Sequence, residues 1–561
     1  MRDRRPTAAD GQPPPGAAAD ALNPGCEVVG LTPPAPPTQP SFRLICFNTP
    51  YLDYLLRQAR EVVERYDVDG IFYDIVLLQP CHCHRCMGEM IRRGMDPHRP
   101  ADALALAREM QERYLTLATA AARSRDKRLR VCHNGGHLTR GDRAYVRHHS
   151  HLELESLPTA AWGYDHFPIS ARYVSSLGIE FLGMTGKFHT AWGEFGGYKH
   201  DNALLYECAA MIAQGARCSI GDQLHPRGAM DADTYRKMGI AYAHVKECEP
   251  WVRGADPVSE VAIVSVEAVR GARRSLDAHA ADRSTRADTG AARVLLERQV
   301  MFDVRDTAAD LDRYSLLVLP DEVTLDEPLA ARLQAYVDRG GKLLLTGASG
   351  VDPEQKRFAL LDVGTVRGRS EYEADYLKPT GPLVVLDQQQ GAAPRLARAP
   401  LFALGGGWHV EPAVGATVMA DLWRPYFRRD IRHFCSHQHA PADAPTGFPA
   451  AFVAGNVGYV AHDLFGQYAD RGQPMYRDLL YYMIEALLGR RPNPVVGLPS
   501  GGGPRSPINP PTGGTCCTCS TPPPSAAPTT RCRVGTSTSL RRLKTSCRCT
   551  TSLAPFAPTA Q

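Results

Sequence analysis

The chain has 561 residues, 43% of them hydrophobic, and a formal net charge of +4. This length predicts two or three domains with at least one large core, which excludes a wholly disordered protein. Basic and acidic residues are interspersed, so no basic stripe for nucleic acid is present. No apolar run reaches the ~18 residues that span a bilayer, and the opening MRDRRPTAADGQPPPG lacks the core of a secretory signal. We therefore expect a cytoplasmic protein without a nucleic-acid partner, membrane partner or organic cofactor.

Both ends of the chain differ in composition from its centre. Residues 1–41 are dominated by Pro, Ala and Gly, and residues 491–561 by Pro, Ser, Thr, Gly and Cys, and neither segment carries a helical or strand period. Such segments bury too little apolar surface to offset chain entropy, so we interpret them as disordered. The alternative is out-of-frame translation of a GC-rich gene, because the bias begins abruptly where the folded pattern stops.

Residues 42–255 alternate short apolar strands with amphipathic helices, which is typical of parallel βαβ units. The predicted strands are Leu44–Asn48, Gly70–Asp74, Leu129–Asn134, His151–Ser156, Glu180–Thr185 and Ala216–Asp222. The predicted helices include Tyr51–Tyr66, Ala103–Ala122 and Asn202–Gln214. A closed barrel of this type needs eight units, so the pattern predicts a TIM-type (β/α)8 barrel that lacks its first units.

Residues 256–490 form a second α/β pattern, which we interpret as a flavodoxin-like domain. The predicted strands are Val261–Val266, Leu316–Pro320 and Lys342–Thr346, with a helix at Pro328–Arg339 that ends at two glycines. Ala451–Asp463 and a helix at Tyr476–Leu488 are expected to close the domain. The segment between these parts is interpreted as a β-rich insertion.

A carboxylate follows the second predicted strand. Asp74 ends the segment DVDGIFYD and therefore lies at the carboxyl end of its strand, where barrel enzymes place catalytic groups. We predict that Asp74 is a catalytic nucleophile. A helix cap or a loop-ordering carboxylate is the structural alternative.

The segment HLELESLP places two glutamates on one strand face. Strand alternation sends Glu153 and Glu155 to the same side, and burial of two like charges is costly unless they serve a site. Glu155 lies nearer the carboxyl end, so we predict that it is the general acid/base opposite Asp74, with Glu153 as the fallback. Exposure on an edge strand is the alternative.

Polar and aromatic residues at the other strand ends and in the following loops suit sugar binding, because aromatic faces pack on pyranose rings while Asn, His and Asp bond hydroxyls. The candidate substrate-binding residues are Asn48, His133, Asn134, Trp162, Tyr164, His166, His189, Trp192, Asp222 and His225. Each of them can equally be a core residue.

Three cysteines follow the Asp74 strand with the spacing C-x-C-x-x-C. Cys81, Cys83 and Cys86 can converge on one structural zinc ion, for which Cys46 or His84 is a possible fourth ligand. A ligand from missing upstream sequence is a further option, and three reduced loop thiols are the alternative to a metal site.

Several stretches resemble the hypothetical glycosyl hydrolases in which a barrel is joined to a beta-galactosidase trimerisation-type domain. The matching stretches of the barrel are CFNTPYLDYLL, DVDGIFYDI, HNGGHL, HLELESLP, WGYDHFP, GMTGKFHTAWGEFGG and GARCSIGDQLHPRG, and the stretch of the second domain is LVLPDEVTLDEPLAARLQAYVDRGGKLLLTG. The second domain is similar to class I glutamine amidotransferases, but the turn after Lys342–Thr346 reads GASG where those enzymes place a cysteine nucleophile. We therefore expect a structural domain there and a homo-oligomer built through it.

The resemblance also bears on chemistry. The family forty-two beta-galactosidases carry a C-x-C-x-x-C zinc loop with one further upstream cysteine, which implies zinc at this loop. Their catalytic pair is two glutamates, whereas Asp74 is more similar to the aspartate nucleophile of alpha-L-fucosidases and amylase-like barrels. We therefore expect a glycosidase that cleaves an O-glycosidic bond of a galactoside, fucoside or related oligosaccharide. The alternative is an inactive, truncated homologue that binds carbohydrate or mediates assembly.

Overall fold

The computed structural model describes residues 44–270, 278–352, 354, 357–360, 362–380, 399–433, 436–492, 503–505, 507–509, 514–515 and 518–520. The predicted segment 1–41 and most of the segment 491–561 lie outside these residues. The chain divides into two compact units. Unit 1 comprises Met1–Glu155, Gly178–Leu182 and Gly271–Ala281, and unit 2 comprises Ser156–Leu177, Gly183–Arg270 and Asp282–Gln561.

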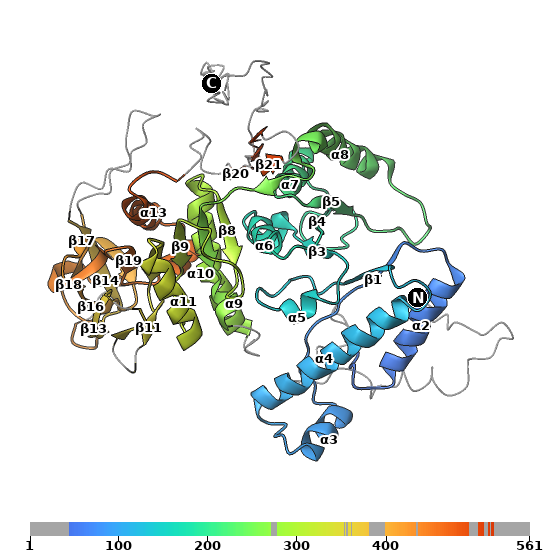
Figure 1. Ribbon diagram of the computed structural model, residues 1–561, viewed down its shortest axis with the longest axis horizontal. Coiled ribbons are helices and arrows are strands. Elements are labelled where there is room, and N and C mark those ends of the chain that lie inside the picture. Colours follow the sequence, from blue (N-terminus) through green and yellow to red (C-terminus); the bar gives the residue numbers. More distant parts are fainter. Residues whose placement is uncertain are drawn as a thin grey trace. The chain divides into compact units, whose positions relative to one another are not determined.

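Figure 1 shows the elements of both units. The elements up to the end of β3 are α2 (Tyr51–Arg65), β1 (Gly70–Tyr73), α3 (His84–Arg92), α4 (Pro100–Ala122), β2 (Arg130–His133), α5 (Arg143–Val146) and β3 (Leu152–Glu155). The next elements are a π-helix η2 (Pro158–Trp162), α6 (His166–Val174), β4 (Phe181–Gly186), α7 (Asp201–Ala213), β5 (Arg217–Gly221), α8 (Ala232–Val252) and β6 (Asp256–Pro257).

The later elements form the second predicted domain and the described part of the tail. They begin with β7 (Val261–Val264), α9 (Val266–Arg270), α10 (Ala278–Glu297), β8 (Phe302–Arg305), β9 (Leu316–Leu319), α11 (Glu327–Asp338) and β10 (Lys342–Thr346). They continue with β11 (Val351–Asp352), β12 (Arg357–Phe358), β13 (Gly364–Arg369), β14 (Ala374–Pro379), β15 (Leu401–Leu404), β16 (Trp408–Pro412), β17 (Thr417–Pro425), β18 (Ala442–Ala454) and β19 (Val457–Val460). They end with α12 (Leu464–Arg471), α13 (Pro474–Leu488), β20 (Gly503–Arg505), β21 (Pro507–Asn509), β22 (Gly514–Thr515) and β23 (Thr518–Ser520).

In unit 1, helices α2 and α4 lie side by side and cover one face of the parallel pair β1–β2 (Figure 1). The helix α2 is amphipathic, since Leu52, Leu56 and Ala59 recur at helical spacing and are buried. They pack with Tyr73 of β1 and with α4 in one apolar cluster. The two helices therefore hold β1 and β2 in place, and the carboxyl ends of these strands carry the candidate site.

Five of the six predicted barrel strands are confirmed as β1 to β5. The strand predicted at Leu44–Asn48 is wrong, because only Ile45 forms an isolated bridge. The chain turns immediately afterwards: the Thr49 hydroxyl donates to the Cys46 carbonyl at 2.7 Å, and the amide of Leu52 donates to the Thr49 carbonyl. This turn ends the extended segment and begins α2.

Unit 2 contains a nine-stranded sheet in the order β15-β14-β17-β18-β19-β10-β9-β7-β8. Its parallel part, β8-β7-β9-β10-β19, has the order 2-1-3-4-5 when numbered along the chain. This is the flavodoxin-like order of doubly wound sheets. The predicted flavodoxin-like domain is therefore confirmed.

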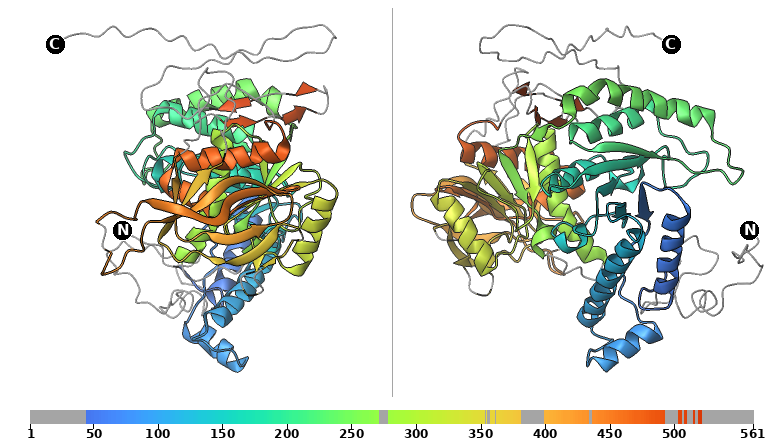
Figure 2. Two further views of the ribbon diagram at one scale, coloured as in Figure 1. Left: turned by 90° about the vertical axis from the view of Figure 1, so that its left-hand side faces the viewer. Right: turned by 45° about the vertical axis from the view of Figure 1, so that its right-hand side comes forward.

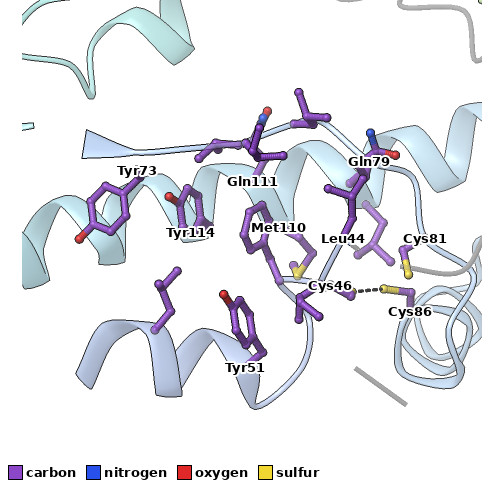
Figure 3. Close-up of a pocket in the computed structure, with 18 of the residues that line it drawn as sticks. Leu44, Cys46, Tyr51, Tyr73, Gln79, Cys81, Cys86, Met110, Gln111 and Tyr114 are labelled. Atoms are coloured by element: carbon purple, nitrogen blue, oxygen red, sulfur yellow. Dashed lines mark hydrogen bonds between the residues drawn. The ribbon is translucent and has the colours of Figure 1, made fainter. Parts of the chain in front are cut away.

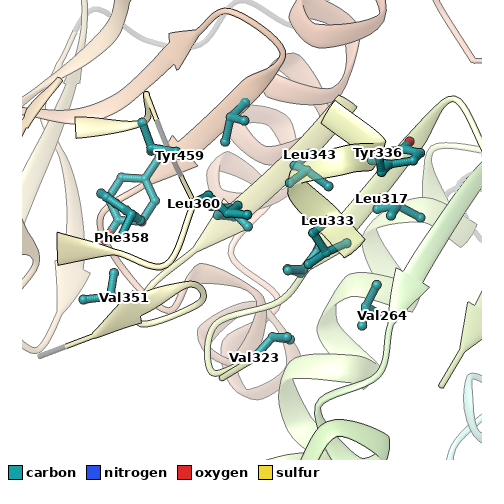
Figure 4. Close-up of a cluster of buried hydrophobic side chains, with 14 of the residues drawn as sticks. Val264, Leu317, Val323, Leu333, Tyr336, Leu343, Val351, Phe358, Leu360 and Tyr459 are labelled. Atoms are coloured by element: carbon teal, nitrogen blue, oxygen red, sulfur yellow. The ribbon is translucent and has the colours of Figure 1, made fainter. Parts of the chain in front are cut away.

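A continuous apolar core stabilises this sheet (Figure 4). Leu333 and Tyr336 of α11 pack with Leu317 and Leu343 on one face. The helix α13 covers the other face, where it crosses the strands (Figure 2), and a Cβ added at Gly458 would lie 3.0 Å from a methyl group of the helix. The sheet is thus buried on both faces, as parallel strands require.

Within the described residues, the segment predicted to be a β-rich insertion contains eight strands. The strands β11 to β18 follow β10, and four of them form a second sheet in the order β11-β12-β13-β16. The other four extend the main sheet through antiparallel pairs.

Helix α6 is tied to strand β8 within unit 2. The guanidinium of Arg172 donates to the Phe302 carbonyl at 2.6 Å and lies 4.1 Å from the centre of the Phe302 ring. The Tyr173 hydroxyl donates to the Asp306 carboxylate at 3.0 Å. All four residues are buried, so the contact links the last part of the barrel region to the flavodoxin-like domain.

None of the described helices combines the length and the apolar character needed to cross a membrane.

Candidate active site

Two carboxylates of unit 1 share one amide group. The Nδ2 atom of Asn134 donates to Oδ1 of Asp74 at 2.8 Å and to Oε1 of Glu155 at 2.5 Å. The amide of Gly136 donates to the Asn134 side-chain oxygen at 3.1 Å, which fixes the orientation of the amide group. The structure therefore brings together the predicted nucleophile, the predicted acid/base and one predicted substrate ligand.

The backbone places these three residues at adjacent strand ends. Phe72 pairs with Cys132 in the β1–β2 register. The pairing continues past the strands, since the Asn134 amide donates to the Tyr73 carbonyl and the Val76 amide donates to the Asn134 carbonyl, both at 2.7 Å. Asp74 and Asn134 consequently project from the same face.

The residue after Asp74 has an unusual backbone conformation. Ile75 has a φ of 57°, a left-handed value that is costly for a β-branched side chain. The strained residue lies between Asp74 and Val76, whose amide is held by Asn134. The surrounding hydrogen bonds thus hold the chain in the bend that presents Asp74.

Glu155 has the electrostatics of a general acid. Burial raises its pKa, the hydrogen bond from Asn134 opposes this effect, and the carboxylates of Asp74 and Glu153 raise the pKa further. A raised pKa keeps a carboxyl group protonated closer to neutral pH, as proton donation to a leaving group requires.

Glu153 lies two residues earlier on the same strand face, which is one step deeper from the strand end. The Nε2 atom of His151 lies 2.9 Å from its Oε1 atom. The thiol of Cys132 is close to both side chains, because ligand atoms of the three residues all lie within 4.8 Å of one another. Glu153 therefore has its own partners, distinct from the Asp74–Asn134–Glu155 group.

Asp74 also lines a cavity of about 420 Å³ in unit 1 (Figure 3). Its wall includes the aromatic rings of Tyr51, Tyr73 and Tyr114 and the side chains of Gln79 and Gln111, drawn in Figure 3. This volume is within the range of small-molecule sites, but Asn134 and Glu155 are not among the residues that line the cavity. Cys46, Cys81 and Cys86 line the same cavity.

Four buried thiols form the candidate metal centre. The Sγ atoms of Cys46, Cys81, Cys83 and Cys86 all lie within 4.8 Å of one another, with Cys46 at 3.5 Å from Cys86 and 4.0 Å from Cys83. Tetrahedral zinc with Zn–S bonds of ~2.3 Å needs sulfur atoms about 3.8 Å apart. The four residues therefore fit a structural zinc ion, with Cys46 in the fourth position.

Two predicted substrate ligands have other surroundings. The side-chain amide of Asn48 donates to the Sγ atom of Cys86 at 3.6 Å, so it belongs to the thiol cluster. His133 is buried and stacks on Tyr73, and its two ring nitrogens bond the hydroxyls of Tyr114 at 3.2 Å and Thr119 at 2.9 Å. Burial lowers the pKa of His133 to about 3. We do not include Asn48 or His133 in the proposed substrate site.

The other predicted substrate ligands lie in three loops of unit 2. After β3 lie Trp162 at the end of η2, Tyr164, and His166 at the start of α6; His189 and Trp192 follow β4, and Asp222 and His225 follow β5. The first two loops are joined by a 2.6 Å hydrogen bond from the Thr159 hydroxyl to the His189 carbonyl. The rings of Phe195 and His225 lie 6.3 Å apart and join the second loop to the third. Unit 2 thus gathers this second set of polar and aromatic groups.

Sequence reasoning missed a buried ion pair next to these loops. The ammonium group of Lys199 lies 2.7 Å from Oε2 of Glu207 and donates to the Thr185 hydroxyl at 2.7 Å. Burial, and then Glu207, raise the pKa of the neighbouring Tyr164. No motif marks this group, because Glu207 is part of an otherwise apolar helix face.

Comparison with known proteins identifies the class. Residues 292–365 match the family described as the beta-galactosidase trimerisation domain. Alpha-L-fucosidase isoenzyme 2 from Paenibacillus thiaminolyticus is 39% identical over 86% of this chain and 72% of that chain, with a TM-score of 0.78. No curated protein sequence matches the chain.

More distant structures share the fold. The beta-galactosidase from Bacillus circulans sp. alkalophilus is 12% identical over 84% of this chain and 77% of that chain, with a TM-score of 0.61. The beta-galactosidase from Halorubrum lacusprofundi is 18% identical over 88% of this chain and 82% of that chain, with a TM-score of 0.58.

These findings define a glycoside hydrolase in which a (β/α)-barrel region is joined to a flavodoxin-like trimerisation-type domain. The chain belongs to the family of alpha-L-fucosidase isoenzyme 2. The expected fold class and family resemblance are therefore confirmed.

Proposed function

We propose that the protein is a retaining glycosidase that hydrolyses alpha-L-fucosides, with Asp74 as the nucleophile and Glu155 as the general acid/base. The observation that carries the roles is the shared Asn134 amide, which holds one oxygen of each carboxylate. The choice of sugar is supported by the 39% identity to an alpha-L-fucosidase. A beta-galactoside is the alternative substrate, supported by the more distant relatives.

The geometry favours retention of the anomeric configuration. Because the two oxygens lie 2.8 and 2.5 Å from one nitrogen, they are at most about 5.3 Å apart. Retaining enzymes hold their carboxyl groups ~5–5.5 Å apart, whereas inverting enzymes leave ~6.5–9.5 Å for a water molecule. The bound on these two oxygens of Asp74 and Glu155 therefore supports the retaining arrangement.

The proposed reaction has two steps. The Asp74 carboxylate attacks the anomeric carbon while the bond to the leaving oxygen breaks, and Glu155 gives its proton to that oxygen. A water molecule then attacks the anomeric carbon, its proton passes to the Glu155 carboxylate, and the bond to Asp74 breaks. Asn134 positions both carboxylates through one rigid amide, and the raised pKa of Glu155 suits the first proton transfer.

The thiol cluster is proposed to hold a structural zinc ion with Cys46, Cys81, Cys83 and Cys86 as ligands. Four thiolates leave no open position, so this ion would stabilise the fold around the cavity and take no part in hydrolysis. The trimerisation-type domain is proposed to mediate a homo-oligomer, since residues 292–365 match a family named for that role.

The function is tested with a panel of aryl glycosides that includes alpha-L-fucoside and beta-galactoside, assayed with the full chain and its Asp74→Asn variant. Asp69→Asn is a matched control, because Asp69 is exposed and directly precedes β1. We expect the full chain to hydrolyse the fucoside. Asp74→Asn should abolish this hydrolysis, and Asp69→Asn should retain it. Absence of hydrolysis by folded protein would instead support an inactive carbohydrate-binding homologue.

A further inference from the structure

A second group of metal-binding side chains lies on the inner face of the strands in unit 1. It consists of Cys132 on β2 and of His151 and Glu153 at β3, and its ligand atoms all lie within 4.8 Å of one another. The three residues are separate from the four-thiol cluster. They are also separate from the Asp74–Asn134–Glu155 group, since Glu153 bonds His151 at 2.9 Å.

The group has the donor chemistry of a zinc site. A thiol, an imidazole and a carboxylate are the three ligand types that zinc accepts, and sites with three protein ligands keep one position for water. Cys132 and Glu153 both line a cavity of about 20 Å³, which has room for one water molecule. A hard cation such as magnesium would not select a buried thiol.

One buried atom in the group lacks a protein partner. Within the described part of the chain, Nδ1 of His151 is buried and accepts or donates no hydrogen bond. Cys132 is 2% exposed, so its sulfur atom is shielded from solvent water. An unsatisfied buried polar atom is costly, so this imidazole has room for one more partner.

We infer that Cys132, His151 and Glu153 bind a second zinc ion, independently of the four-thiol cluster. The site lies two residues before Asn134 and Glu155 on their strands, directly beneath the proposed catalytic pair. Its cation would neutralise Glu153 and brace β2 against β3. The inference does not depend on the proposed glycosidase activity.

The test is the zinc content of the purified full chain. Protein is depleted with a chelator, dialysed against Zn²⁺ and analysed by mass spectrometry of the metal. Cys132→Ser, His151→Gln and Glu153→Gln are compared with Cys218→Ser, a cysteine outside both groups, and circular dichroism checks the fold of each variant. Glu153→Gln preserves side-chain shape, so it reports on the site even if Cys132→Ser does not fold.

We expect each of the three variants to hold one zinc ion fewer per chain than the wild type and the Cys218→Ser control. Their affinity for that ion should fall by at least ~100-fold, because a lost ligand costs more than a lost outer partner. In the Co²⁺-loaded protein, Cys132→Ser should lose one thiolate-to-cobalt absorption. Equal zinc content and identical cobalt spectra in wild type and folded variants would overturn the inference. If the four-thiol cluster lost its zinc in every protein, the three variants would still hold one zinc ion fewer than the wild type. The zinc count therefore distinguishes the two sites.

Discussion

Asn134 and Glu155 are joined by a 2.5 Å hydrogen bond from an amide nitrogen that also bonds Asp74. This bond lowers the pKa of Glu155, whereas burial and two neighbouring carboxylates raise it. The position of one amide thus influences both the geometry and the protonation of the proposed catalytic pair.

Replacement of this amide should change the pH profile. Asn134→Ala removes the hydrogen bond that opposes the rise of the Glu155 pKa, so the alkaline limb of kcat/KM should move to higher pH. Activity at the optimum should fall about 100-fold, because the carboxylates lose their shared anchor. The measurement is kcat/KM against pH for both proteins. An unchanged alkaline limb would show that Asn134 does not act on the proton donor.

Glu155→Gln should show the dependence on leaving group that identifies a general acid. Hydrolysis of a glycoside with a poor leaving group should fall about 10²–10⁴-fold. Dinitrophenolate leaves without a proton, so the first step with a dinitrophenyl glycoside needs no general acid. Azide should then restore turnover, because it replaces the water molecule that Glu155 activates in the second step. Glu180→Gln, at a surface carboxylate paired with Arg130, serves as the control. Equal losses for both leaving groups would argue against Glu155 as the acid/base.

Cys46→Ser should remove the zinc ion of the four-thiol cluster and destabilise the protein. Structural zinc contributes apparent binding free energies of ~10–16 kcal/mol in small zinc domains, so even a fraction of this value should lower Tm by many degrees. Thermal unfolding is measured with and without a chelator. The chelator should lower the Tm of the wild type by many degrees more than that of Cys46→Ser, and a chelator-independent wild type would contradict the zinc assignment.

The flavodoxin-like domain should lose stability as pH rises from ~4 to ~8. Burial and the neighbouring Asp463 raise the pKa of Asp321 to about 8, whereas an unfolded aspartate titrates near ~3.9. The folded state therefore keeps a proton that the unfolded state has lost, and stability falls through this window. Asp321→Asn should flatten the dependence of Tm on pH, and the exposed Asp310→Asn should not. The same slope in all three proteins would show that Asp321 does not titrate in this way.

The order of elements was predictable because their hydrophobic periods are strong. Strand β8 was not predicted, since Asp303 and Arg305 interrupt its apolar pattern. In the structure these side chains form a buried ion pair at 2.6 Å, and the Tyr314 hydroxyl bonds Asp303. The two residues are only two positions apart, but their burial depends on tertiary contacts that a short window of sequence does not show.

The site could be predicted only in part. The rule that barrel enzymes use strand ends located Asp74 and Glu155, and strand alternation already separates Asn134 from His133. The alternation places His133 on the helix side, where it is buried against Tyr114. The proximity of Cys132 to Glu153 depends on how β2 and β3 are aligned, and sequence does not specify that register.

The most direct test of the proposed mechanism is to trap its covalent intermediate. A 2-deoxy-2-fluoro fucosyl fluoride slows both steps and lets the glycosyl–enzyme accumulate, and peptide mass spectrometry then locates the label. We expect one label per chain, on Asp74, together with loss of activity that recovers as the label is hydrolysed. A label on Glu153, Glu155 or another carboxylate of an active enzyme would contradict the assignment of Asp74 as the nucleophile.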